Sequence, residues 1–233
     1  MNPPIVILAG GLATRLHPLT LEVPKSLVKV NGREFIAWQL ELLAKSGIDS
    51  VILCLGYRSK EIIDFVGDGE RFGLRIQFSV EENPLGTGGA LKKAESLLEE
   101  VFGVIYGDSY LPIRYDEIFK KFFEKEKLGL MTVYRNSNKF DKSNVYISQN
   151  GEISYSKKSA TVKMQHIDYG FNVLSKEALK TLNAYEFYDL SDLLEHLANT
   201  KELMAYEVYE RFYEIGSFKG IVDLERYLER EKM

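Results

Sequence analysis

A short apolar run that ends on two glycines constrains the fold of this chain more than any other feature. Residues Ile5 to Leu8 read Ile-Val-Ile-Leu, and Gly10 and Gly11 follow them. A β-branched run bounded by glycine predicts a buried strand. Because glycine has no Cβ, the backbone N–H groups after this strand can approach a ligand closely. We therefore expect a ligand-binding loop directly after the first strand.

Basic side chains follow this loop. Thr14 and Arg15 come soon after the glycines, and Lys25 stands directly after Pro24. Backbone amides that cradle oxygens, together with an Arg fork and a Lys charge, suit a polyphosphate. Neither the Gly-x-Gly-x-x-Gly fingerprint of dinucleotide-binding folds nor the Gly-Lys-Ser/Thr of a P-loop is present.

Composition narrows the class of protein. The chain has 233 residues and a net charge of −4, so a broad basic surface for nucleic acid is not expected. Its single cysteine, Cys54, lies in an apolar run and is predicted to be a buried strand residue. Apolar runs are too short for a membrane span, and no signal-peptide pattern opens the chain. We expect a cytoplasmic protein with one domain over residues 1–233.

Strand and helix patterns alternate along the first half of the chain. They predict strands at 5–8, 50–55, 74–80 and 101–106, and helices at 35–46, after Ser59, at 90–100 and at 115–127. This order indicates an α/β fold with a doubly wound, mostly parallel, Rossmann-like sheet. Ligands in such folds bind beyond the carboxyl ends of the strands. The segment around Asn150-Gly151 predicts a small β-meander.

Two further candidate sites follow predicted strands. Glu81 and Glu82 precede the stretch Pro-Leu-Gly-Thr-Gly-Gly, residues 84–89, and Asp108 follows the strand at 101–106. An aspartate at the carboxyl end of a central strand is well placed to hold Mg²⁺ together with substrate phosphates.

The opening string resembles that of the sugar-nucleotidyltransferase family, the enzymes that make nucleoside-diphosphate sugars. The family motif is Gly-Gly-x-x-Thr-Arg-Leu-x-Pro-Leu-Thr followed by Pro-Lys, and every specified position matches here. The resemblance implies condensation of a nucleoside triphosphate with a sugar 1-phosphate, with release of pyrophosphate. It also implies catalytic roles for Arg15, at the leaving pyrophosphate, and for Lys25, at the α-phosphate. The nucleotide-binding residues that we expect are Leu8, Ala9, Gly10, Gly11, Thr14, Glu81, Gly86, Gly88 and Gly89.

Glu81 or Glu82 is expected to read the edge of the base, and Gly88-Gly89 to pack on its face. A carboxylate can accept hydrogen bonds from guanine N1–H and N2–H₂, which favours GTP, although cytosine N4 would also donate to it. The resemblance assigns Mg²⁺ to Asp108 and Glu214. The family has Asp and Thr where this chain has Glu214 and Ser217, and often Asn where it has Ser109.

The acceptor side departs further from the family pattern. Lys158 is our first choice for the sugar phosphate and Lys157 the second, because the family's Glu-x-Lys-Pro is incomplete here. Asp168, Tyr169 and Gly170 stand where the family faces the acceptor sugar, and a carboxylate beside a ring suits a polyol.

The strings Tyr-Gly-Asp-Ser-Tyr-Leu, Asp-Tyr-Gly and Tyr-Glu-Ile-Gly-Ser resemble the short heptose 1-phosphate guanylyltransferase subgroup. Alternatives are a CTP- or UTP-dependent transferase for another phosphorylated acceptor and a catalytically silent nucleotide-binding subunit. An NAD-linked oxidoreductase is disfavoured, since the second strand ends in Cys54-Leu55-Gly56 without an acidic residue. The oligomeric state is open, with a homo-oligomer as one option.

Overall fold

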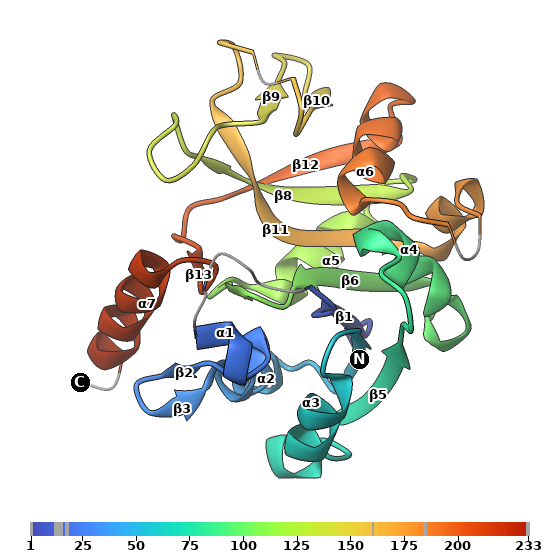
Figure 1. Cartoon of the computed structure of the whole chain (residues 1–233). Coiled ribbons are helices and arrows are strands. Elements are labelled where there is room, and N and C mark those ends of the chain that lie inside the picture. Colours follow the sequence, from blue (N-terminus) through green and yellow to red (C-terminus); the bar gives the residue numbers. More distant parts are fainter. Residues whose placement is uncertain (1, 12–15, 17–18, 160, 184–185, 232–233) are drawn as a thin grey trace.

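The computed structural model of the chain describes residues 2–11, 16, 19–159, 161–183 and 186–231. A mixed β-sheet runs through its centre, with helices packed on both sides (Figure 1). Nine strands of the described residues form this sheet: β1 (Ile5–Leu8), β4 (Ser50–Leu55), β5 (Arg75–Val80), β6 (Val101–Tyr106), β8 (Gly129–Arg135), β9 (Val145–Ile147), β10 (Ile153–Tyr155), β11 (His166–Ser175) and β12 (Leu203–Val208).

The parallel half of the sheet consists of the strands that the sequence predicts as apolar runs. β1 lies between β4 and β6 and is parallel to both, so that Leu8 stands beside Cys54 on one side and Tyr106 on the other. β5 continues in the same direction beyond β4. Since these four strands run the same way, Gly10 and Asp108 both follow strand ends at one edge of the sheet. The doubly wound, mostly parallel architecture is confirmed.

The other half of the sheet begins with β11, which is antiparallel to both β6 and β8. β12 runs parallel to β8 at the outer edge. β9 and β10 form a hairpin whose turn holds Gly151 at a φ of +81°. The expected β-meander is present as this hairpin, and one residue pair connects it to β11.

Helices connect the strands on both faces (Figure 1). Among the described residues the α-helices are α1 (Leu19–Glu22), α2 (Phe35–Lys45), α3 (Ser59–Val66), α4 (Gly86–Lys93), α5 (Tyr115–Phe123), α6 (Leu190–Asn199) and α7 (Phe218–Arg230). Short 3₁₀ segments are η2 (Lys25–Leu27), η3 (Glu70–Phe72), η4 (Glu95–Leu97) and η5 (Lys176–Thr181). Every helix in this part of the chain is too short or too polar to cross a lipid bilayer.

Two apolar cores lie on opposite faces of the sheet. Helices α2, α3 and α5 bury their apolar sides against Ile5 and Ile7 of β1. Helices α4 and α6, with η5, pack on the other face against Val6 and Leu8. Alternate side chains of β1 thus enter different cores, as expected of a strand that is buried on both faces. Cys54 is 2% exposed in the second core, which confirms its prediction as a buried strand residue.

A third apolar cluster attaches α7 to the amino-terminal region. It includes Leu16, Val30 and Leu224. Strands β2 (Lys29–Val30) and β3 (Arg33–Glu34) form a hairpin, and its turn residue Asn31 bonds to Glu225 of α7 through both its backbone and side-chain N–H groups. A second small antiparallel pair consists of β7 (Ser109–Tyr110) and β13 (Tyr213–Glu214), and Tyr110 and Tyr213 contribute to the same apolar cluster.

Three helix predictions need correction. The helix expected at 90–100 begins at Gly86 and ends at Lys93, so the glycines form its first turn instead of a loop before it. Ser59 is the first residue of α3 and not its N-cap, which is Arg58 at a φ of +56°. The helix expected at 115–127 ends at Phe123, whose side chain is 62% exposed.

Candidate active site

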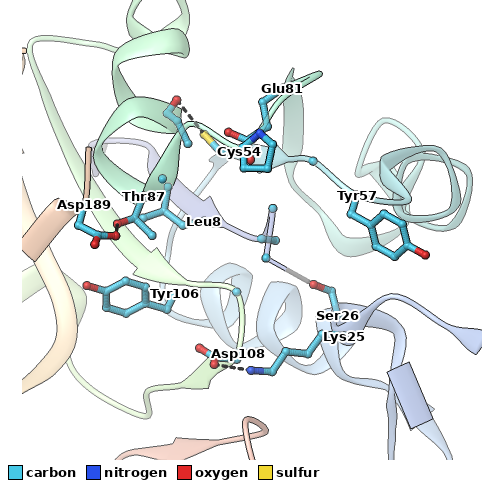
Figure 2. Close-up of a pocket in the computed structure, with 18 of the residues that line it drawn as sticks. Leu8, Lys25, Ser26, Cys54, Tyr57, Glu81, Thr87, Tyr106, Asp108 and Asp189 are labelled. Carbon is cyan, nitrogen blue, oxygen red and sulfur yellow. Dashed lines mark hydrogen bonds and ion pairs between the residues drawn. The ribbon is translucent and has the colours of Figure 1, made fainter. Parts of the chain in front are cut away.

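A cavity of about 680 Å³ opens where the parallel strands end (Figure 2). Its walls come from the loops after β1, β4, β5 and β6, from η2 and from the first turn of α4. Among the predicted site residues it is lined by Leu8, Ala9, Gly10, Gly11, Lys25, Glu81, Gly86 and Asp108. Residues not predicted for the site include Ser26, Tyr57, Thr87, Tyr106, Phe187 and Asp189.

Lys25 and Asp108 face each other at this cavity (Figure 2). Lys25 Nζ lies 2.6 Å from Asp108 Oδ2, and the side chains are 16% and 27% exposed. Lys25 opens η2 after Pro24, and Asp108 follows β6, so two motifs far apart in sequence meet here. A charged pair at this distance makes a charge-assisted hydrogen bond and gives the cavity one fixed ammonium and one fixed carboxylate.

Glu81 lies behind the first glycine loop. A Cβ on Gly10 would stand 2.8 Å from Glu81 Oε1, and a Cβ on Gly56 would stand 3.0 Å from the same oxygen. Glu81 Oε2 accepts a hydrogen bond from the backbone N–H of Leu85 at 3.2 Å. Burial raises the pKa of Glu81, while this hydrogen bond and the charge of Lys93 partly oppose the rise. The glycines at these positions therefore make room for a carboxylate of the chain itself.

The second glycine-rich stretch packs under the segment that leads into α6. Gly88 N–H and Gly89 N–H both donate to the carbonyl oxygen of Tyr188, at 2.8 and 3.2 Å. A Cβ on Gly89 would lie 2.6 Å from a carbonyl oxygen of the same segment. Backbone therefore covers Gly88 and Gly89, the two glycines that we expected to face the base. Of the three glycines predicted to bind nucleotide in this stretch, Gly86 alone lines the cavity. Close chain packing, as much as ligand binding, explains this glycine-rich string.

The same segment supplies cavity residues that sequence reasoning missed. Asp189 is the N-cap of α6, and its Oδ1 lies 3.5 Å from Thr87 Oγ1. Thr87 Oγ1 in turn accepts the backbone N–H of Leu190 at 2.7 Å. Phe187 and Tyr57 line the cavity with rings that are 66% and 54% exposed. The available signal for Tyr57 was its place directly after the strand-ending Gly56.

Backbone hydrogen bonds hold the segment of Glu214 next to Asp108. β13 pairs with β7, which starts directly after Asp108, and the N–H that follows Glu214 donates to the Asp108 carbonyl at 2.9 Å. The Glu214 carboxylate accepts hydrogen bonds from Ser217 Oγ at 2.7 Å and from the N–H of Gly216. It therefore sits at the N-terminus of α7, where the helix dipole favours negative charge. Its role as a metal ligand stays a prediction.

The donor set at the cavity suits a hard cation that arrives with phosphates. The carboxylate of Asp108 offers the oxygen ligand that Mg²⁺ prefers. Within the described ranges no three His, Cys, Asp or Glu side chains gather to form a cage for a metal. Magnesium in phosphate-transfer sites commonly uses one or two carboxylates, with substrate oxygens and water completing its shell. Asp108 fits that arrangement.

The predicted acceptor lysines differ in their surroundings. Lys158 Nζ lies 2.8 Å from Asp192 Oδ1 of α6, and its side chain is 71% exposed. Lys157 is the second choice, and its positive charge lowers the pKa of the Asp168 carboxyl. Of the two lysines, Lys157 is therefore the one whose charge acts on Asp168, which is predicted to bind the acceptor sugar.

Asp168, Tyr169 and Gly170 lie in β11, outside the cavity lining. Gly170 has a φ of +102°, and a Cβ there would stand 3.7 Å from the ring of Tyr106, which does line the cavity. Asp168 Oδ1 accepts the N–H of Gly170 at 3.0 Å. The Tyr169 ring is 2% exposed and packs edge-on against Phe212 with the ring centroids 5.8 Å apart. Asp168 and Gly170 are thus next to the cavity wall, whereas Tyr169 belongs to the core.

Thr14 and Arg15, the remaining predicted residues, lie outside the described residues. Their contacts remain expectations from the sequence.

Comparison with known proteins defines the class of this fold and site. The sequence model of the nucleotidyl transferase family matches residues 5–229, and the chain belongs to that family.

Individual relatives agree with this class. The chain is 29% identical over 201 residues to the D-glycero-alpha-D-manno-heptose 1-phosphate guanylyltransferase of Campylobacter jejuni, with 86% of this chain and 87% of that protein aligned. It is 31% identical over 224 residues to the mannose-1-phosphate guanylyltransferase catalytic subunit beta of Xenopus tropicalis, and the match covers 93% of this chain and 62% of that protein. The structure of HddC from Yersinia pseudotuberculosis superposes with a TM-score of 0.80 at 27% identity and covers 97% of this chain and 99% of that one. HddC has also been solved in complex with GMP-PN.

Proposed function

We propose that this protein condenses a nucleoside triphosphate, with GTP preferred, and a sugar 1-phosphate to an NDP-sugar and pyrophosphate. The observation that carries the proposal is the meeting of Lys25 and Asp108 beside Gly10 and Gly11 in one cavity at the ends of the parallel strands. Relatives named guanylyltransferases support GTP as the nucleotide. A heptose 1-phosphate is the proposed acceptor. The Campylobacter jejuni relative, which aligns over most of its own length and of this chain, is named for that substrate.

The reaction joins two anions, so the chain has to position them and offset their charge. An oxygen of the sugar phosphate attacks the α-phosphorus of the triphosphate in line, a new P–O bond forms, and the bond to the pyrophosphate group breaks. The acceptor phosphate is already ionised at neutral pH. No side chain therefore has to act as a nucleophile.

The residues around the triphosphate have separate tasks. The backbone N–H groups of Gly10 and Gly11 bind phosphate oxygens, since both glycines line the cavity. Lys25 offsets charge at the α-phosphate. For this its ammonium leaves the Asp108 carboxylate and contacts a phosphate oxygen instead. Arg15, placed by resemblance to the family motif, offsets the charge that builds on the leaving pyrophosphate.

Asp108 would hold Mg²⁺, with Glu214 as the second proposed ligand. The cation, when bound, neutralises phosphate charge and orients the phosphate oxygens. Glu214 takes part only if its carboxylate leaves the N–H of Gly216 and the hydroxyl of Ser217. Asp108 needs only to exchange its contact with Lys25, so it is the primary ligand in this proposal.

Base recognition and acceptor recognition are assigned to different residues. Glu81 is the proposed partner for the guanine N1–H and N2–H₂ groups, since its carboxylate lies at the cavity wall behind Gly10. Lys157 is proposed to bind the sugar phosphate and Asp168 the sugar hydroxyls, because Lys157 is the lysine whose charge lowers the pKa of the Asp168 carboxyl.

Pyrophosphate release tests the proposal. The purified protein is assayed with Mg²⁺ and each of GTP, CTP, UTP and ATP against a panel of sugar 1-phosphates that includes heptose and mannose 1-phosphate. We expect the highest kcat/KM with GTP, and a loss of about 100-fold or more in Asp108→Asn with the fold retained. Nucleotide binding without pyrophosphate release from any pair would instead indicate a silent nucleotide-binding subunit.

A further inference from the structure

The turn that carries Asp108 is tied to neighbouring elements through its backbone. Residues 106–109 connect β6 to β7, and we call them the Asp108 turn. Within it, the N–H of Gly107 donates to the carbonyl of Leu8 at 2.9 Å, and the N–H of Ile215 donates to the carbonyl of Asp108 at 2.9 Å. The middle of the turn is thus bonded to the end of β1 and to the residue after β13.

A glutamine of α2 binds both ends of the Asp108 turn. Gln39 Nε2 donates to the carbonyl of Tyr106 at 3.0 Å and to the carbonyl of Ser109 at 2.8 Å. These are the first and last residues of the turn, so Asp108 lies between the two acceptors. An amide nitrogen carries two N–H donors, which allows one side chain to bridge the turn in this way.

Gln39 occupies a position in the interior of α2 that is otherwise apolar. It is 1% exposed, and Ile36, Leu40 and Leu43 of the same helix are buried with it. Its Oε1 has no hydrogen-bond partner among the described residues, and an unpaired buried acceptor costs free energy. An apolar side chain would fill this position without that cost. The two bonds to the Asp108 turn are therefore what the glutamine contributes.

The Asp108 turn determines where the Asp108 carboxylate stands. Asp108 Oδ2 lies 2.6 Å from Lys25 Nζ, which comes from η2 on the opposite side of the cavity wall (Figure 2). Gln39 is buried and is not part of the cavity lining. Any effect of Gln39 on nucleotide or cation therefore passes through the backbone of the turn.

We propose that Gln39 is a positioning residue that fixes the Asp108 turn and so holds the Asp108 carboxylate in place for Lys25 and for a divalent cation. The cation-binding role of Asp108 rests on the proposed function, whereas the hold of Gln39 on the turn does not. Without the two bonds the turn opens more often, and the carboxylate takes up other positions. Groups that orient a metal ligand in this way raise the affinity of the site.

Amide hydrogen exchange tests the hold on the turn without any ligand. In wild-type protein the Nε2 protons of Gln39 should exchange slowly, because they are buried and hydrogen-bonded. In Gln39→Met and Gln39→Leu, which lack the donors, we expect the amides of Gly107 and Ile215 to exchange about tenfold faster. The amide of Ala9, which donates to the carbonyl of Cys54 at 2.8 Å, should keep its rate.

Tyr115→Phe is the matched control for the exchange experiment. Tyr115 is also 1% exposed, and its hydroxyl donates to the carbonyl of Leu111, just beyond the turn, at 2.9 Å. Loss of this donor should leave the amides of Gly107 and Ile215 unchanged.

Three results of the exchange experiment would overturn the proposal. The first is fast exchange of the Gln39 side-chain amide in wild type, which decides the matter even if neither Gln39 variant folds. The second is an unchanged rate at Gly107 and Ile215 in folded Gln39→Met. The third is an equal acceleration at Ala9, since the change would then reflect a general loss of stability.

Mn²⁺ binding tests whether the positioned turn serves a cation. The comparison is made in a Lys25→Met background, because the ammonium otherwise competes for Asp108. There we expect Gln39→Met to lower the Mn²⁺ affinity about tenfold and Tyr115→Phe to leave it unchanged. Asp108→Asn should abolish the same binding. Electron paramagnetic resonance of free Mn²⁺ measures all three variants.

The outcomes separate this proposal from the proposed function. Equal Mn²⁺ affinity with and without Gln39→Met would overturn the action of Gln39 on the cation site. Mn²⁺ binding that persists in Asp108→Asn would instead contradict the metal role of Asp108, and the exchange experiment would still decide the hold of Gln39 on the turn.

The catalysed reaction gives a further readout. We expect Gln39→Met to raise the Mg²⁺ concentration for half-maximal rate about tenfold, with the KM for the sugar phosphate within about twofold of wild type. Excess Mg²⁺ should restore most of kcat, because the site is weakened and not removed. A loss of kcat that Mg²⁺ does not restore would contradict the proposal and assign Gln39 a role in packing alone.

Discussion

Lys25 Nζ lies 2.6 Å from Asp108 Oδ2, and this contact joins the amino-terminal motif to the end of β6. The contact also shows that the two proposed binding groups for phosphate and metal satisfy each other in the free protein. Nucleotide and cation have to separate them, so each ligand should bind better in the presence of the other.

Replacing Lys25 by methionine should therefore affect catalysis and metal binding in opposite directions. We expect Lys25→Met to lower kcat/KM by about 100-fold, because charge at the α-phosphate is no longer offset. The affinity of the nucleotide-free protein for Mn²⁺ should rise several-fold, since Asp108 loses its internal cation. Electron paramagnetic resonance of free Mn²⁺ measures the second effect.

Lys92→Met is the control for this prediction, because Lys92 makes a comparable 2.8 Å ion pair with Glu95 outside the cavity. The interpretation fails if Lys25→Met and Lys92→Met leave the Mn²⁺ affinity equally unchanged.

The two glycine-rich stretches should respond differently to alanine. A Cβ on Gly89 would meet a carbonyl oxygen at 2.6 Å, whereas a Cβ on Gly11 has nothing within 4 Å among the described atoms. We expect Gly89→Ala to lower the free energy of unfolding by roughly 1–3 kcal/mol through overpacking. Gly11→Ala should unfold like wild type but bind nucleotide more weakly. Chemical denaturation and nucleotide titration of both variants decide this, and equal stability of the two would speak against the packing role of Gly89.

Glu81 should determine the choice of base. In Glu81→Gln, the ratio of GTP to UTP affinity should fall by about tenfold, because the carboxylate that accepts from guanine is lost. Glu82→Gln, an exposed neighbour that also lines the cavity, is the matched control and should keep the ratio. Thermal-shift titrations with GTP and UTP measure this affinity ratio in both variants. A preference that survives Glu81→Gln would remove Glu81 from base recognition.

Asp168 should make the folding stability of the protein depend on pH. Burial raises its pKa from 3.8 to about 6, so the folded state binds a proton between these values that the unfolded chain has lost. The contribution of this group to folding stability therefore falls as pH rises through that window. Asp168→Asn should be more stable than wild type at pH 7, by on the order of 1–3 kcal/mol, and the difference should shrink toward pH 4. Urea unfolding at both pH values measures it, and a pH-independent difference would show that Asp168 titrates normally.

The parallel half of the fold was predictable from local pattern. β1, β4 and β6 are apolar runs bounded by glycine or turn residues, and each is found within one residue of its expected bounds. The helix at Gly86 was placed too late, because four residues rich in glycine disfavour a helix locally. Packing under the segment at Tyr188 overrides that preference.

Site residues were predictable where they follow a strand directly, as Gly10 and Asp108 do. The contributions of Phe187 and Asp189 were not, because they depend on a loop that crosses α4 only in the folded chain. The irregular register of β11 was likewise hidden, since its bulge breaks the strict two-residue alternation that a strand pattern predicts.

The most direct test of the central claim is ³¹P NMR of the protein mixed with Mg²⁺, GTP and D-glycero-α-D-manno-heptose 1-phosphate. We expect the resonances of GTP and of the sugar phosphate to decline together while those of a GDP-sugar and pyrophosphate appear, and we expect Asp108→Asn to abolish this change. Appearance of the same products at an equal rate in folded Asp108→Asn, or GTP binding by wild type without product from any sugar 1-phosphate, would contradict it.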